Sequence, residues 1–366
     1  MMWIEKVKLS DICSPKQWKT IPTSDLLNEG YPVYGANGII GYYNEYNHEN
    51  PVVTVTCRGA TCGSINITVP KAYVTGNAMC LDDLKNDIEI EYLYYCLKHY
   101  DFKNVISGSA QPQITRQGMD KIYIMLCSRE EQRDIVNKLK KTEKVIKLRK
   151  QELQLLDDLA KARFAEMFGY PVSNPYGYDK VALSDLADIK IGPFGSLLHK
   201  EDYIVGGHPL LNPSHIVDGR ISPDNKLTIS DEKYKELSAY QLKTGDVVMG
   251  RRGEMGRCAV VSEEGFLCGT GSILIRTKGD VTADYIQKTI SFPSFKKTIE
   301  DMAVGQTMPN LNVPIVSSFE IIKPPIEVQD RYYALVEQVD KSKVEIQKAL
   351  NKTQMLFDSL MQEYFG

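Results

Sequence analysis

Two long stretches of the chain, residues 130–168 and 327–365, are rich in Glu, Lys, Gln and Leu and contain no glycine or proline in their interiors. Such composition predicts two long helices. In each stretch one set of mostly apolar positions recurs every seven residues, namely Leu139, Ile146, Leu153, Ala160, Met167 and then Tyr332, Val339, Ile346, Thr353, Leu360. A narrow heptad seam favours a coiled coil, most simply one helix against the other. A helix packed only on its own domain would need a wider apolar face.

The chain before each long helix has a different hydrophobic pattern. Short runs rich in Val, Ile and Thr are separated by glycine turns and predict strands at 51–59, 63–70, 73–81, 245–253, 257–262 and 271–277. Each half then has a segment with apolar residues at helical spacing, 90–102 in the first half and 283–302 in the second. Pro293 is expected to interrupt the second of these helices. Both halves are therefore predicted to be mixed and β-rich.

The two halves are copies of one another. VKLSDIC at 7–13 matches VALSDLA at 181–187, a shift of 174 positions, and GSAQPQIT at 108–115 matches GQTMPNLN at 305–312, a shift of 197 positions. Between these landmarks, TVTCRGATCG at 54–63 resembles VMGRRGEMGR at 248–257, each a strand entering an Arg-Gly loop. Landmarks that keep the same order indicate a duplication. The sequence thus predicts an α+β protein with globular domains at 1–129 and 181–326, spacer helices at 130–168 and 327–366, and a linker at 169–180.

This organisation suggests a function by geometry. If the helices pair antiparallel, two similar heads would be held at a fixed separation and related by an approximate twofold axis. Duplex DNA suits such a protein, because sites on one face of the duplex recur about 34–36 Å apart. Regular protein or peptide arrays would fit the same geometry.

Composition narrows the class of protein. The chain has 366 residues, of which 43% are hydrophobic and 25% charged, as is usual for soluble globular proteins. No apolar run approaches 18 residues, and the N-terminus has charges where a signal peptide would be apolar. The eight cysteines form no CxxC pair and no Cys/His group with zinc spacing, which predicts reduced thiols, no metal site and a cytoplasmic location. The net charge of −3 still allows a local basic surface.

Motifs for catalysis are weak. No G-x-x-x-x-G-K-[ST] loop for nucleotide phosphates is found, and GRRGEMG at 250–256 lies between apparent strands, as a turn does. Asn174-Pro175-Tyr176 is better explained by a turn than by base flipping, and the carboxylates and lysine between Pro223 and Lys233 by a solvated loop. The five histidines are not placed near a nucleophile. The sequence predicts no catalytic residue.

Residues able to read DNA do occur in the predicted loops. Arginine pairs with guanine and Asn or Gln with adenine, while Lys and hydroxyl groups contact phosphates. The candidates are Tyr34, Asn37, Arg58, Thr61, Gln111, Gln113, Ser196, His199, Lys200, Asn212, His215, Arg251, Arg252, Gln306 and Asn310. For each of them, a role in stabilising its loop is the alternative. Arg58 and Arg252 are the strongest candidates, because the glycine after each permits close approach of the backbone. The Gly108 and Gly305 stretches could instead shape the entry into each long helix.

The order of these motifs resembles the specificity subunits of type I restriction–modification systems. The resemblance covers the chain from PVYGANGIIGYYNEY at 32–46 through GNAMCL, GSAQPQIT and EEQRDIVNKLKK, and then from KIGPFGS through GDVVMGRRGEMGRCAVV, GQTMPNLN and IEVQDRYYALVEQVDK. It implies two target-recognition domains that each read half of a split DNA site, with the helices as spacer and docking surface. Modification subunits, two of them, and restriction subunits would be the partners. S-adenosylmethionine, ATP and Mg²⁺ would belong to those partners, leaving this chain without cofactor or catalysis of its own.

Three alternatives remain at this point: a specificity chain of a related system that cuts beside its site, a self-sufficient methyltransferase or nuclease, and a coiled-coil scaffold that binds proteins only. The two copies differ most between residues 187 and 252, where the second is longer. We therefore expect a target with two dissimilar half-sites.

Overall fold

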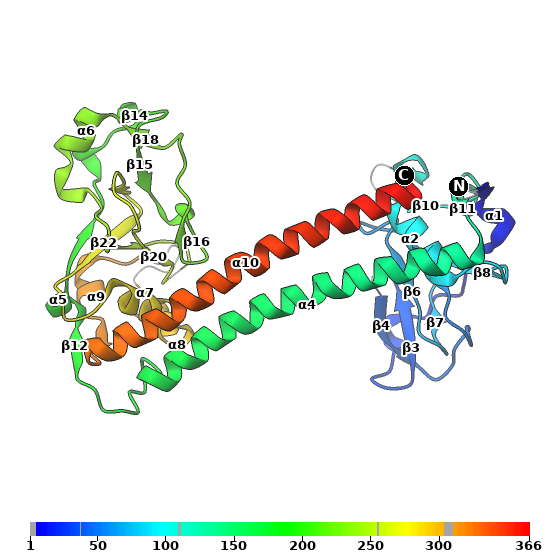
Figure 1. The fold of residues 1–366 in the computed structure, drawn as a ribbon, viewed down its shortest axis with the longest axis horizontal. Coiled ribbons are helices and arrows are strands. Elements are labelled where there is room, and N and C mark those ends of the chain that lie inside the picture. The colour runs from blue at the N-terminus through cyan, green and yellow to red at the C-terminus, as the bar shows by residue number, and fades with distance from the viewer. Residues whose placement is uncertain (1–4, 37, 109–110, 255, 304–309) are drawn as a thin grey trace. The chain divides into compact units, whose positions relative to one another are not determined.

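The computed structural model describes residues 5–36, 38–108, 111–254, 256–303 and 310–366 (Figure 1). The chain divides into two compact units: unit 1 contains residues 1–153 and 345–366, and unit 2 contains residues 154–344. Both mix helices and strands, and the α+β class predicted from the sequence is confirmed. Among the described residues, none of the helices is long and apolar enough to cross a bilayer.

Unit 1 is built around a four-stranded antiparallel sheet in the order β2-β8-β5-β6. Its strands are β2 (Ser14–Gln17), β8 (Ala78–Asp82), β5 (Val53–Thr56) and β6 (Ile65–Ile67). A three-stranded sheet adds β4 (Gly38–Tyr43), β3 (Tyr31–Gly35) and β7 (Tyr73–Val74), and smaller pairs join β1 (Glu5–Lys8) to β11 (Tyr123–Leu126) and β9 (Ile106–Ser107) to β10 (Gln113–Ile114). The helices besides the long ones are α1 (Leu9–Ile12), α2 (Ile90–His99) and α3 (Arg116–Met119).

Unit 2 repeats this plan. Its main sheet has the order β13-β22-β19-β20, formed by Ala187–Ile191, Ser272–Thr277, Val247–Gly250 and Cys258–Val260. The pair β12 (Lys180–Ala182) and β23 (Glu320–Ile322) corresponds to β1 and β11. The remaining elements are α5 (Leu183–Leu186), β14 (Tyr203–Ile204), β15 (His208–Leu211), β16 (Ile216–Val217), β17 (Arg220–Ile221), β18 (Thr228–Ile229), α6 (Asp231–Glu236), β21 (Leu267–Cys268), α7 (Ala283–Ser291), α8 (Pro293–Met302) and α9 (Val313–Ser317). Pro293 begins α8 and separates it from α7, as predicted.

The two copies differ where the sequence lengths differ. Between β13 and β19, unit 2 contains β14, β18, the β16–β17 hairpin and α6, whereas the matching part of unit 1 is mainly the β3–β4 hairpin. Core strands keep their register in both copies, because a slip by one residue would turn buried side chains toward solvent. The connections between these strands carry no such constraint and have diverged.

The long helices are α4 (Arg129–Phe168) and α10 (Ile326–Phe365), each of 40 residues. Within unit 1, α4 supplies Leu139 and Ile146 to a core that also contains Phe357 and Tyr364 from the end of α10. Arg149 donates hydrogen bonds to the carbonyl of Ala349 and the hydroxyl of Thr353, and Lys138 Nζ lies 3.5 Å from the hydroxyl of Tyr364. Since residues early in α4 meet residues late in α10, the two segments are antiparallel here.

The reciprocal arrangement is found within unit 2. The core of unit 2 takes Phe164 and Phe168 from the end of α4 and Tyr332 from the start of α10. The Tyr332 hydroxyl donates to the carbonyl of Ala160 at 3.1 Å, and Lys343 forms an ion pair with Asp157. These segments are antiparallel as well. Each long helix thus begins in the core of one unit and ends in the core of the other.

The heptad positions all lie on the sides of the helices that are removed from solvent. Leu139, Ile146, Tyr332 and Val339 are buried, and Leu153, Ala160, Met167, Ile346, Thr353 and Leu360 are half-buried. Thr353 departs from the apolar pattern because its hydroxyl accepts the hydrogen bond from Arg149.

A buried glutamine fixes the start of each long helix to its unit. Gln132 accepts a hydrogen bond from the backbone N–H of Glu89, at the start of α2, and donates one to the carbonyl of Cys127, both at 2.9 Å. Gln329 accepts from the N–H of Thr282, at the start of α7, and donates to the carbonyl of Pro324. The two amides are equivalent in the repeat and almost completely buried.

Replacing Gln132 by leucine is expected to lower the free energy of unfolding by about 3 kcal/mol, because a buried N–H and a buried carbonyl lose their partner. Urea unfolding followed by circular dichroism measures this change. Gln338→Leu, at an exposed position of α10, serves as the control and should change stability by less than about 0.5 kcal/mol. Equal effects of the two substitutions would show that the buried amide does not hold the helix.

Candidate nucleic-acid interface

In unit 1 the Arg-Gly loop lies directly beside the loop that contains Gly108 and Pro112, called here the Gly-Pro loop. Arg58 and Gln113 form an isolated β-bridge. The backbone N–H of Gly59 donates to the carbonyl of Pro112 at 3.1 Å, and the N–H of Ile114 donates to the carbonyl of Cys57 at 3.0 Å. Arg58, Gln111 and Gln113 are exposed. An arginine and two glutamines predicted from separate motifs are therefore brought onto one surface.

Unit 2 has the same arrangement at the equivalent positions. Arg252 and Asn310 form the bridge, and the N–H of Leu311 donates to the carbonyl of Arg251 at 2.9 Å. The guanidinium of Arg251 donates through Nε to the side-chain oxygen of Asn310 at 3.0 Å. Partial burial, and then the charge of Arg252, lower the pKa of Arg251 from its usual value. Arg251 is half-buried and held in place, whereas Arg252 is exposed.

A third loop, which precedes β8 or β22, completes the surface in each unit. The N–H of Cys57 donates to the carbonyl of Asn77 at 3.1 Å, and the N–H of Arg251 donates to the carbonyl of Gly271 at 3.0 Å. The glycine after each exposed arginine has a positive φ, 86° at Gly59 and 78° at Gly253. This conformation disfavours residues with a side chain, so the backbone geometry explains the Arg-Gly pair in both copies.

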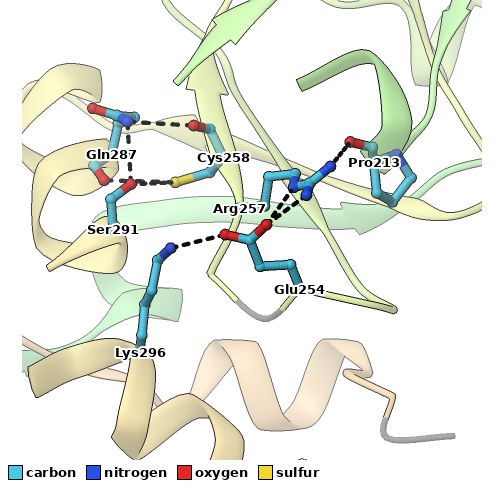
Figure 2. A network of polar contacts seen from close by, with 7 residues as sticks. All are labelled: Pro213, Glu254, Arg257, Cys258, Gln287, Ser291 and Lys296. Carbon is cyan, nitrogen blue, oxygen red and sulfur yellow. Dashed lines mark hydrogen bonds and ion pairs between the residues drawn. The ribbon is translucent and has the colours of Figure 1, made fainter. Parts of the chain in front are cut away.

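The Arg-Gly loop of unit 2 is held by an additional network of polar contacts, shown in Figure 2. Glu254 accepts hydrogen bonds from Arg257 and lies 3.2 Å from Nζ of Lys296 on α8, while Arg257 also donates to the carbonyl of Pro213. The neighbouring Arg257 and Lys296 lower the pKa of the Glu254 carboxyl. Glu254 is therefore ionised at neutral pH and bonds both cations. These contacts are lost when the carboxylate is protonated, as the pH falls through the acidic range. Unit 1 has Ala60 at the equivalent position.

The other candidates of unit 2 lie in the segment that is longer than in unit 1. Ser196, His199 and Lys200 are exposed in the connection that follows β13. Asn212 is half-buried, and its side-chain oxygen accepts from the N–H of Gly271 at 3.2 Å, which ties this segment to the third loop. His215 is buried, with Nδ1 at 2.9 Å from the carbonyl of Leu210. It stabilises the fold and is not available to a ligand.

In unit 1, Thr61 is half-buried in the turn that closes the Arg-Gly loop, where its carbonyl accepts from the N–H of Ser64. Tyr34 is buried, and its hydroxyl accepts a hydrogen bond from the N–H of Val69 at 3.2 Å. It therefore does not belong to the exposed surface. Asn37 and Gln306 lie outside the described residues.

Two exposed residues of the third loops were not among the candidates. Asn77 follows Gly76 in unit 1, and Thr270 lies between Gly269 and Gly271 in unit 2, where its hydroxyl donates to the carbonyl of Pro193 at 2.8 Å. GNAMCL at 76–81 and TGSILI at 270–275 occupy equivalent places in the two copies, so the repeat was the signal that could have drawn attention to this loop. Of the excluded motifs, Asn174 forms the expected turn, in which it bonds the backbone of Tyr178 through both side-chain atoms. The other differs from the solvated loop expected, because Asp231, Glu232 and Lys233 lie in the short helix α6.

Loops from three parts of the chain thus present arginines and amides on one surface of each unit, and this arrangement occurs twice. The model of the type I restriction modification DNA specificity domain matches residues 3–157 and again residues 175–353. The chain therefore belongs to this family, and the resemblance seen in the sequence is confirmed.

Individual relatives agree with this assignment. The chain is 20% identical over 323 residues to the type I restriction enzyme MjaVIII specificity subunit of Methanocaldococcus jannaschii, covering 80% of this chain and 75% of that protein. It is 23% identical over 304 residues to the MjaIX specificity subunit of the same organism, covering 76% and 68%. The crystal structure of the type I restriction–modification S subunit from M. genitalium superposes with a TM-score of 0.64 at 14% identity, covering 100% of this chain and 96% of that one. A structure concerned with complex assembly and conformational transition of a type I system gives a TM-score of 0.62 at 18% identity, covering 99% and 97%. The two structures show the same fold.

Proposed function

We propose that this chain is the non-catalytic DNA-specificity subunit of a type I restriction–modification complex and reads a bipartite, asymmetric duplex target. The observation that carries the proposal is the duplicated surface, on which the backbones of an exposed arginine and a residue with a side-chain amide form a β-bridge, at Arg58–Gln113 and again at Arg252–Asn310. Arginine can bond both guanine acceptors in the major groove, and Gln or Asn can do the same for adenine. The divergent segment between β13 and β19 supports two dissimilar half-sites.

The long helices support the second part of the proposal, that they set the interval between half-sites. Each of these 40-residue helices contributes residues to both units, as a spacer between two recognition surfaces would. An α-helix is stiff over such a length when a partner helix packs along it.

The same helices expose apolar side chains that would suit protein partners. In unit 1 these are Val145, Leu148, Met355 and Leu356, and in unit 2 they are Leu155, Leu159 and Val344. Exposed apolar residues that gather on paired helices are typical of a docking surface. We propose that two methyltransferase subunits dock on the chain, together with restriction subunits where the system has them. S-adenosylmethionine, ATP and Mg²⁺ would then be bound by those subunits, in the cytoplasm.

Co-expression with a type I methyltransferase subunit from the same organism, followed by sequencing of the methylated bases, tests this function. The expected result is methylation at a split motif whose two halves differ. A palindromic motif would contradict the proposal that the two half-sites differ. The isolated chain should bind duplex DNA with an affinity that falls steeply as salt is added. A chain that binds no DNA at low salt would be a protein scaffold, and one that binds S-adenosylmethionine or cuts DNA alone would be an enzyme.

A further inference from the structure

Unit 1 contains a cluster of three possible metal ligands, two of which lie on β8. Nε2 or Nδ1 of His48, Sγ of Cys80 and a carboxylate oxygen of Asp82 all lie within 4.8 Å of one another. Cys80 and Asp82 are on β8, and His48 follows β4 and forms an isolated bridge with Ala72. Cys80 is buried, and the side chains of His48 and Asp82 are 10% and 14% exposed.

The hydrogen bonds around His48 determine which ring nitrogen carries the proton. The amide of Asn47 is oriented by Val74, because its oxygen accepts from the Val74 N–H at 2.9 Å and its nitrogen donates to the Val74 carbonyl at 3.0 Å. The Asn47 oxygen can only accept, and it lies 2.6 Å from Nδ1 of His48. Nδ1 must therefore carry the proton, and the lone pair of a neutral imidazole is at Nε2.

That lone pair faces a carboxylate. Nε2 of His48 is 3.0 Å from one oxygen of Asp82, whose other oxygen accepts from the indole N–H of Trp18 at 3.1 Å. Two acceptors at this distance repel one another unless a positive charge lies with them. The nearby ammonium group of Lys16 is placed over the ring of Trp18, 3.8 Å from its centroid.

In unit 2, the position equivalent to Asp82 has a positively charged side chain. Arg276 on β22 corresponds to Asp82 on β8, since both pair with the first strand of their sheet, Arg276 with Asp188 and Asp82 with Ser14. The guanidinium of Arg276 bonds both oxygens of Asp246. In unit 2, therefore, the positive charge that balances a carboxylate belongs to the side chain of Arg276. In unit 1 the cluster consists of an imidazole, a thiol and a carboxylate.

We propose that His48, Cys80 and Asp82 bind a divalent transition-metal ion of the zinc type through Nε2, Sγ and one carboxylate oxygen. Two ligands about 2.0–2.2 Å from a tetrahedral ion are about 3.3–3.6 Å apart, so the nitrogen and oxygen, now 3.0 Å apart, need to separate by only about 0.3–0.6 Å to hold the ion. Binding forms one bond from each ligand atom and releases the proton of the Cys80 thiol to solvent. His48 and Asp82 also line a cavity of about 570 Å³, through which water can reach the site.

Such an ion would connect two parts of unit 1. His48 lies beside the sheet of β3, β4 and β7, and the other two ligands belong to the main sheet. The metal would fix the β3–β4 hairpin against the strands that lead into the recognition loops. Spacing in the sequence does not reveal the site, because His48 is far from the other ligands along the chain and none forms a pair of the usual zinc type.

Titration of the chelator-treated, reduced full-length chain with Co²⁺ tests the proposal. The expected result is one ion per chain, an absorption band from thiolate-to-Co²⁺ charge transfer, and displacement of that band by Zn²⁺. Cys80→Ser and His48→Gln should abolish the band. Asn47→Ala should weaken binding about 10- to 100-fold, because it removes the acceptor that orients the imidazole.

Two matched controls separate this site from general metal binding. Asp83→Asn changes the exposed carboxylate next to Asp82, and Cys62→Ser changes a half-buried thiol outside the cluster, so both variants should keep the band. Circular dichroism confirms that each variant is folded. Absence of the band in the unmodified chain, or a band that persists in folded Cys80→Ser, would overturn the proposal and identify His48 and Asp82 as a plain ion pair.

Discussion

The Arg252→Ala substitution is expected to weaken binding of one half-site by about 5- to 150-fold and to leave recognition of the other half-site unchanged. A bidentate arginine–guanine contact contributes about 1–3 kcal/mol of discrimination. Arg252 is exposed, follows a strand that is buried along its length and precedes a glycine with positive φ, so its side chain is positioned by rigid backbone. Arg58→Ala should have the mirror effect, on the half-site read by unit 1.

Competition between duplexes measures this effect. One competitor carries both half-sites, and two others each have one half-site replaced by unrelated sequence. The Arg252→Ala protein should no longer distinguish the duplex that lacks the half-site of unit 2 from the intact one. Arg220→Ala, an exposed arginine on the β16–β17 hairpin, serves as the control for loss of charge.

Arg252→Lys separates two roles of the arginine. Lysine keeps the positive charge but cannot form the paired hydrogen bonds of a guanidinium. If Arg252 reads a base, the lysine variant should resemble the alanine variant in specificity while it keeps most of the salt dependence of binding. If Arg252 only contacts phosphate, lysine should restore nearly full affinity, and discrimination between half-sites should be unaffected by either substitution.

The sequence predicts features that depend on local pattern, such as the long helices, but not features that depend on tertiary contacts. The long helices were predicted to within one residue at their starts, because 40 uninterrupted helical residues carry a clear periodic signal. The Arg-Gly and Gly-Pro loops stand out through their repetition, since the two motifs recur in the same order. Their pairing through the Arg58–Gln113 and Arg252–Asn310 bridges is a tertiary contact that periodicity does not contain.

Single loop residues were harder to predict. Tyr34 and His215 have side chains typical of DNA contacts, but both are buried, with Tyr34 bonded to the N–H of Val69 and His215 next to the carbonyl of Leu210. A polar residue in a loop serves the loop as often as a ligand, and burial decides between the two uses. Conversely, Asn77 is exposed in the third loop although the sequence analysis does not single it out.

The extent of each compact unit was also not apparent from the sequence. The heptad pattern indicates that α4 and α10 pair, but it does not show that the last turns of α10 enter the core of unit 1 or that those of α4 enter the core of unit 2. Phe357 and Tyr364 contribute to the first of these cores, and Phe164 and Phe168 to the second. Because each unit needs segments from both helices, neither half of the sequence contains a complete unit.

Lengthening both helices together is expected to change the preferred gap between half-sites. One added heptad extends a helix by about 10 Å, which corresponds to about three base pairs of duplex DNA. Insertions after Leu153 and after Ile346 would keep the helices in register, because Arg149 contacts Thr353 and Asp157 contacts Lys343 on either side of this level. Both insertion points are heptad positions, so the seam continues through the added residues.

The helical repeat of DNA makes the expected effect more specific. Three added base pairs also rotate the second half-site by about 100° around the duplex, since one turn takes about 10.5 base pairs. Three added heptads extend the helices by about 31 Å, or about nine base pairs, which brings the second half-site to within about 50° of the original face. The three-heptad protein should therefore bind its preferred longer gap more tightly than the one-heptad protein binds its own.

Selection from duplexes with every gap length, with the half-sites held constant, measures the preferred gap of each protein. Insertion into α4 alone is the control: it displaces Asp157 from Lys343 and should destabilise the protein without defining a new gap. If the paired insertions leave the preferred gap unchanged while the proteins remain folded, the helices do not set the interval. The two recognition surfaces would then have to be placed by the partner subunits, and the continuous helices would serve for docking alone.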